Sequence, residues 1–172
     1  MEILKLATEW AKSEVFSTKF FILFALFFLI ASIGFWQLGK TEITKAYIIP
    51  TLVAGVLLMT IGLGLFFTNK ARITQFEQAY HKNVAEFVES EIVRAESTLK
   101  EYQTVVFKAI PLIIIVAALV IVFIHTPTWR AISITTIAML IVILLIDGTA
   151  HSRIDGYYKE LKKIDISNEA KQ

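Results

Sequence analysis

The sequence predicts an all-α polytopic membrane protein with four transmembrane helices in two hairpins. Of its 172 residues 56% are hydrophobic and only 19% are charged, a balance that is unusual for a soluble domain. Four apolar runs carry no charged residue, and the segment between the second and third runs has helical spacing without Gly or Pro. Lipid is therefore expected to be the main solvent of this chain.

Residues 1–19 are predicted to form an amphipathic N-terminal helix. Ile3, Leu6, Ala7 and Trp10 fall on one side of such a helix, which suits the bilayer surface or a surface of other helices. The apolar run that follows is about as long as the ~20 residues of a spanning helix and longer than a signal-peptide core. We therefore expect a transmembrane helix here and not a cleaved signal.

Residues 20–68 are predicted to form the first transmembrane hairpin. Its spans are residues 20–38 and 46–68, joined by a short loop. The second span has small residues on two faces, and small residues let helix backbones approach closely. Both faces are interpreted as packing surfaces, within the monomer or between protomers. The first face holds Thr51, Gly55 and Gly62, and the second holds Thr60 and Gly64.

Residues 69–108 are predicted to form a cytoplasmic helical loop. Apolar residues recur there every three or four positions, and their register changes near Phe87, Val88 and Ser90. A straight helix of this length could not return to the membrane, so we place the turn of a helical hairpin at that change. A loop lying flat on the bilayer is the alternative.

Residues 109–150 are predicted to form the second transmembrane hairpin, followed by a cytoplasmic helix and tail over residues 151–172. The spans, residues 109–124 and 131–146, are short and reach full length with semi-polar neighbours. The connecting loop contains Pro127, a turn residue.

The basic residues predict the orientation in a bacterial-type inner or plasma membrane. Fourteen of the 17 Lys and Arg residues lie in the N-terminal segment, the middle loop and the C-terminal segment. Only Lys40, Lys45 and Arg130 lie in the two hairpin loops. Lys and Arg are retained on the cytoplasmic side, so both termini and the middle loop are expected to be cytoplasmic.

A candidate polar site lies at the cytoplasmic edge of the last span. Asp147, His151, Asp155 and Tyr158 fall within about 80° of one helix face. A His flanked by carboxylates can bind a divalent metal or titrate near neutral pH. A solvated or hydrogen-bonding helix face is the alternative interpretation, and the sequence leaves any metal or cofactor unknown.

Four residues of the middle loop are possible partners for this face. Glu77 with His81, and Glu91 with Arg94, have the spacing of ordinary pairs on one helix surface. Alternatively they face the Asp147 helix across a cytoplasmic four-helix assembly and share a metal with it.

Composition narrows the function to three classes. The chain has no cysteine, so disulfides and cysteine-ligated metal sites are excluded, and its dispersed basic residues predict no nucleic-acid partner. No ionisable residue lies deep in a span, which disfavours ion-coupled transport. A homo-oligomeric pore or membrane effector in the lipid bilayer ranks first. An assembly or adaptor subunit bound to another membrane protein ranks second, and an enzyme at the cytoplasmic leaflet third.

Overall fold

The computed structural model describes residues 2–169, and no strand occurs among them. Met1 and residues 170–172, the end of the expected C-terminal tail, lie outside this range. Four helical segments are long and apolar enough to cross a membrane, so the predicted all-α fold is confirmed and the chain is a small helical membrane protein. The helices are α1 (Glu2–Leu38), α2 (Glu42–Ala46), α3 (Ile48–Lys82), α4 (Val84–Glu101), the π-helix η1 (Tyr102–Ala109), α5 (Ile110–Phe123) and α6 (Pro127–Glu169).

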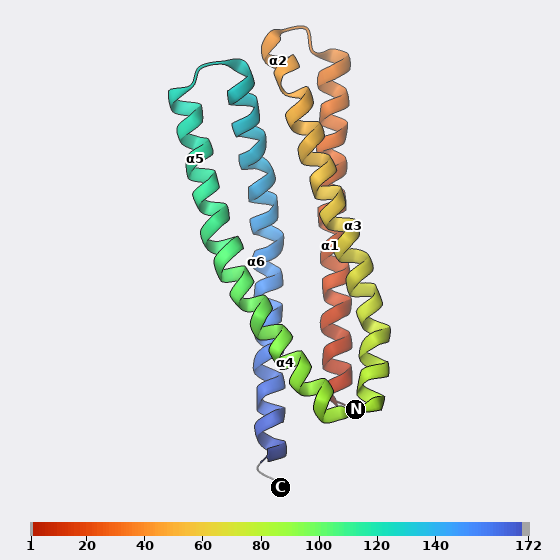
Figure 1. Cartoon of the computed structure of the whole chain (residues 1–172). Coiled ribbons are helices and arrows are strands. Elements are labelled where there is room, and N and C mark those ends of the chain that lie inside the picture. Colours follow the sequence, from red (N-terminus) through yellow and green to blue (C-terminus); the bar gives the residue numbers. More distant parts are fainter. Residues whose placement is uncertain (1, 170–172) are drawn as a thin grey trace.

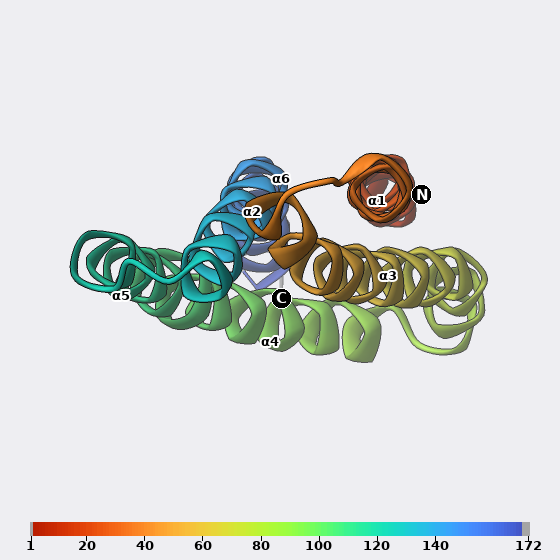
Figure 2. The same cartoon turned by 90° about the horizontal axis from the view of Figure 1, so that it is seen from above.

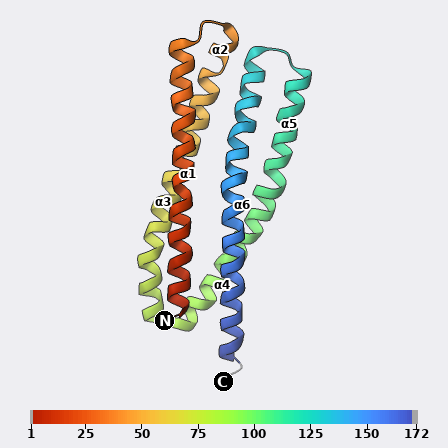
Figure 3. The same ribbon diagram turned by 180° about the vertical axis from the view of Figure 1, so that it is seen from behind.

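The helices form two antiparallel pairs. α1 runs beside α3, and α5 runs beside α6, with the short connections of both pairs at the same end of the molecule (Figure 1). The start of α1, the α3–α4 connection and the end of α6 lie at the opposite end. Seen from behind, α1 and α6 lie side by side and join the two pairs (Figure 3).

The N-terminal amphipathic segment continues into the first span as a single helix of 37 residues. Its apolar stripe does not face outward, because Ile3, Ala7 and Trp10 are buried among residues of α3, α4 and α6. Of the two expected positions, the structure therefore shows packing against the other helices.

The turn of the middle loop is at Asn83, so its expected position near residues 87–90 was wrong. Asn83 is extended (φ −159°, ψ 110°), and its side chain accepts hydrogen bonds from the amides of Ala85 and Glu86. Such an Asn N-cap starts a new helix by satisfying amides that lack helical partners. Phe87 and Val88, whose register suggested the turn, lie within α4 and are both buried.

The molecule has two cores, one above the other along the helices. The helical layer, formed by residues 2–18, 69–101 and 150–164, buries one core of apolar and aromatic side chains. The membrane core lies between the spans and consists of Phe21, Ala25, Leu58, Val142 and Ile146. The two cores adjoin one another where the apolar runs of the spans end.

The small residues of α3 have two different environments. A Cβ added at Gly55 would stand 2.8 Å from Leu29, and one added at Gly62 would stand 2.9 Å from the Cβ of Phe21. This face is therefore used for close packing against α1. A Cβ at Gly64, by contrast, would meet no atom within 4 Å.

The third of the four long helical segments, α4–η1–α5, crosses the molecule diagonally. Seen from above, α5 lies at the outer edge beside α6 and far from α1 (Figure 2). Only Ile110 and Ala117 of α5 are buried. A groove of about 550 Å³ lies between α3 and α6 near the end with the short connections, with Pro50, Thr135 and Met139 among its lining residues.

Candidate functional site

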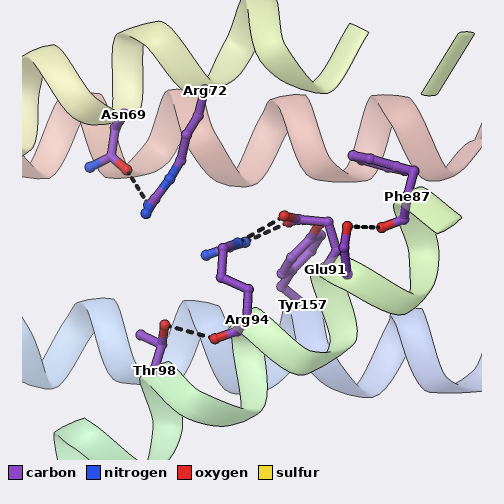
Figure 4. Close-up of polar contacts among 8 residues, drawn as sticks. Asn69, Arg72, Phe87, Glu91, Arg94, Thr98 and Tyr157 are labelled. Atoms are coloured by element: carbon purple, nitrogen blue, oxygen red, sulfur yellow. Dashed lines mark hydrogen bonds and ion pairs between the residues drawn. The ribbon is translucent and has the colours of Figure 1, made fainter. Parts of the chain in front are cut away.

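A buried polar network connects α4 and α6 in the helical layer. Arg94 donates from Nε and Nη2 to the two carboxylate oxygens of Glu91, at 2.8 and 2.6 Å, and the hydroxyl of Tyr157 donates to Glu91 Oε2 at 2.7 Å (Figure 4). The Glu91 side chain is only 6% exposed. A buried carboxylate is tolerated when it is both paired and hydrogen-bonded, and here both conditions hold.

Trp10 of α1 packs into the same network. Its ring stacks on Tyr157 with centroids 5.3 Å apart and an interplanar angle of 15°. The Arg94 guanidinium lies 4.4 Å from the Trp10 ring centroid, a favourable cation–π distance. Trp10 is 8% exposed, yet its indole Nε1 has no hydrogen-bond partner among the described residues.

A second guanidinium enters the network from α3. Arg72 extends toward Arg94, and its Nη1 donates to the Asn69 side chain at 3.0 Å (Figure 4). Burial lowers the pKa of Arg72, and the positive charge of Arg94 lowers this pKa further. Burial also acts to lower the pKa of Arg94, but its hydrogen bonds and ion pair with Glu91 outweigh burial and raise it.

The hydroxyl of Tyr157 is held neutral by its surroundings. Burial first, and then the Glu91 carboxylate, raise the pKa of Tyr157 far above the usual value of a tyrosine. This shift favours the protonated hydroxyl, the form that donates to Glu91.

A cavity of about 420 Å³ lies where the helical layer meets the membrane core, with residues of α1, α3, α4, η1 and α6 in its lining. Trp10, Arg72 and Arg94 line it from the helical layer. Phe21 and Ile146, both members of the membrane core, line it on the other side. Its volume is in the range of small-molecule sites, and it joins charged and apolar walls.

One wall of the cavity is formed by the π-helix. Tyr102, Val105 and Val106 of η1 line it, and Val106 is buried. π-Helical turns are rare and occur frequently at functional sites. The irregular helix thus lies beside a cavity whose lining is both charged and apolar.

Two of the charged residues that line the cavity, Glu14 and Arg94, are neutralised by residues outside its lining. Arg153 of α6 donates to Glu14 of α1 at 3.0 Å, and Arg94 pairs with Glu91. Arg72 and Asp147 have no oppositely charged partner within 4.0 Å among the described residues. Among the described residues the cavity lining therefore combines one unpaired guanidinium, Arg72, with two unpaired carboxylates, the partly buried Asp147 and the exposed Glu101.

The four residues of the predicted polar face of α6 lie in different surroundings. Asp147 lines the cavity, whereas His151 packs edge-on against the rings of Tyr102 and Phe107. Asp155 accepts a 2.6 Å hydrogen bond from Lys159, and the Tyr158 ring lies under the Lys162 amine. The structure thus brings one of the four residues into the candidate site.

The four possible partners also divide into two groups. Glu91 and Arg94 are the centre of the buried network, and Arg94 and Asp147 both line the cavity. Glu77 and His81 are exposed on α3. No group of three potential metal ligands is found among the described residues.

Sequence reasoning missed Trp10, Arg72, Glu14 and Tyr157 as site residues. A signal for Tyr157 was present, because a second series on α6 also has helical spacing. Its members are Ile146, Ala150, Ile154, Tyr157 and Leu161, and all of them are buried. A tyrosine within that otherwise apolar series needs a polar partner for its hydroxyl, and Glu91 supplies it.

Comparison with protein-family models, with curated proteins and with solved structures found no match. The four long apolar helices define the class of the chain as a small polytopic helical membrane protein.

Proposed function

We propose that this protein is a membrane effector that acts as a homo-oligomer, with any passage through the bilayer formed between copies. The observation that carries the proposal is the contrast between two faces of α3. The face with Gly55 and Gly62 packs closely against α1, and the adjoining membrane core is filled by apolar side chains. The face with Thr60 and Gly64 is open.

The open face of α3 suits a second copy of the chain. Gly64 leaves room for a close approach, and the Thr60 hydroxyl donates to the Val56 carbonyl at 2.9 Å, so no polar group there lacks a partner. In lipid, helices associate through this kind of close backbone packing. The opposite face of α3 is already occupied by α1.

Cysteine cross-linking tests the interface. The chain has no cysteine, so Gly64→Cys introduces a single thiol. We expect oxidation in membranes to give a disulfide-linked dimer of Gly64→Cys, because the two copies of α3 meet there. Phe27→Cys, at a position on α1 that is 55% exposed, is the matched control and should stay monomeric. Equal cross-linking of both variants, or none, would contradict the interface.

Flux through liposomes tests the effector itself. Wild-type protein is expected to release a trapped ion, and Gly64→Leu is expected to abolish release by separating the copies while leaving each copy folded. A strict monomer without flux would remove this proposal. Co-purification of another membrane protein in fixed stoichiometry would instead favour the adaptor subunit.

The orientation in the membrane is proposed from the basic residues. Ser97 is exposed on α4 in the helical layer, and Thr128 is exposed beside the α5–α6 connection at the opposite end. We expect Ser97→Cys to react only with a cytoplasmic thiol reagent and Thr128→Cys only with an external one. Labelling of intact cells and of inverted vesicles measures this, and external labelling at position 97 would reverse the topology.

A further inference from the structure

We propose that the cavity between the helical layer and the membrane core binds a phospholipid with a zwitterionic head group. The phosphate would contact Arg72 and the Trp10 indole N–H, and the ammonium group would contact Asp147. The proposal goes beyond the oligomeric effector and requires only that the chain lies in a membrane.

The charges of the cavity select a zwitterion. Glu91 neutralises Arg94, and Arg153 neutralises Glu14, so among the described residues the partly buried lining charges left unpaired are Arg72 and Asp147. A simple anion would bind Arg72 but face Asp147, and a simple cation would bind Asp147 but face Arg72. A head group with both charges satisfies both residues. Glu101, which also lines the cavity, is exposed to solvent.

The phosphate of the lipid would be bound by N–H groups of Arg72 and Trp10 that lack an acceptor among the described residues. Arg72 uses one nitrogen for Asn69 and points toward the like charge of Arg94 (Figure 4). An oxyanion between them would relieve this repulsion and could take two parallel N–H bonds from the Arg72 guanidinium. Trp10 lines the same cavity, and its buried Nε1–H has no acceptor among the described residues. Buried donors of this kind are ordinarily satisfied.

The apolar wall identifies the ligand as a lipid. Phe21, Leu65, Val105 and Ile146 line the cavity, and Phe21 and Ile146 belong to the membrane core. Acyl chains cover such a wall, whereas a free head group leaves it in contact with water at a cost in free energy. The charged end lies in the helical layer, which places the head group at the membrane edge.

Fluorescence of Trp10 can measure this binding directly. Trp36 and Trp129 are exposed, so Trp36→Phe and Trp129→Phe together leave Trp10 as the single reporter. Titration with dihexanoyl phosphatidylethanolamine in detergent is expected to change its emission saturably. Dihexanoyl phosphatidylglycerol lacks the ammonium group and glycerophosphoethanolamine lacks the chains, and each is expected to bind about tenfold more weakly or worse.

Charge-removing variants test the two contacts separately. Arg72→Gln and Asp147→Asn are each expected to weaken binding of dihexanoyl phosphatidylethanolamine by about tenfold or more. Lys70→Gln, two residues from Arg72 and exposed, and Asp155→Asn, two turns along α6 from Asp147, are the matched controls and should bind as the parent does. Circular dichroism and gel filtration establish that each variant is folded.

Several results would overturn the assignment. Equal affinity for the ethanolamine and glycerol lipids, or an unaffected Asp147→Asn, would show that no ammonium contact exists. Equal affinity for glycerophosphoethanolamine would identify a soluble ligand, and a response without saturation would mean that no site is present. If Arg72→Gln does not fold, the comparison of the two lipids on the parent protein decides. Lipid binding is measured without ion flux or cross-linking, so an absence of binding would overturn this inference and leave the proposed oligomer untouched.

Discussion

Replacing Arg94 with methionine is expected to lower the free energy of unfolding by about 3–5 kcal/mol, the usual cost of leaving one partner of a buried ion pair alone. Glu91 would keep its buried charge but lose both guanidinium hydrogen bonds, and the Tyr157 hydroxyl would remain as its side-chain donor. The cation–π contact with Trp10 would also be lost. Equilibrium unfolding in mixed micelles, followed by near-ultraviolet circular dichroism, measures the change.

The double variant Glu91→Gln/Arg94→Met separates the ion pair from general packing. Its destabilisation should be smaller than the sum of the two single variants, because the second substitution removes a charge that the first left unpaired. Lys100→Met breaks the exposed pair of Lys100 with Glu96 on the same helix, and we expect no measurable change there. An Arg94→Met protein as stable as wild type would mean that the network does not hold α4 against α6.

Gly62→Ala is expected to destabilise the α1–α3 pair by about 1–3 kcal/mol through overpacking. The new methyl group would stand 2.9 Å from the Cβ of Phe21 and 3.2 Å from the backbone nitrogen of Ile22. Neither atom is the end of a flexible side chain, so the two helices must move apart. The same unfolding measurement applies.

Gly64→Ala is the matched control for this substitution. It lies two residues along the same helix, where an added Cβ meets nothing within 4 Å, and alanine favours a helix over glycine by about 1 kcal/mol. Unchanged or slightly higher stability is therefore expected for the monomer in detergent. Similar losses for both variants would show that the cost comes from the glycine backbone and not from contact with α1.

The helices were predictable from the sequence because a membrane allows few backbone conformations to cross it. A spanning segment must satisfy its own backbone hydrogen bonds, so each uncharged apolar run had to become a helix. The break at Asn83 was not recognised because the apolar spacing continues through it, and an asparagine cap acts through local hydrogen bonds that periodicity does not show. The change of register at Phe87 was a weaker signal than this single polar residue.

The site was predictable only in part, because it depends on how long helices are rotated against one another. Asp147 was identified as a charge directly after an apolar run, and Glu91 and Arg94 were identified as a pair. One residue corresponds to about 100° around a helix, so Tyr157 is buried in the core whereas its neighbour Tyr158 lies only partly buried at the edge of that core. Trp10 and Arg72 join the site from helices whose rotation no local pattern determines.

The π-helix also affects how a mechanical change can pass through the molecule. α1, α3 and α6 run from the helical layer into the membrane as unbroken α-helices. A shift of one end of such a helix therefore moves its other end as well. Between α4 and α5 the hydrogen bonds change to the wider π pattern. Each residue exchanged between the π and α patterns there turns α5 about its own axis by up to about 100°. Since α5 buries only two of its side chains, it is the membrane helix whose rotation disturbs the cores least.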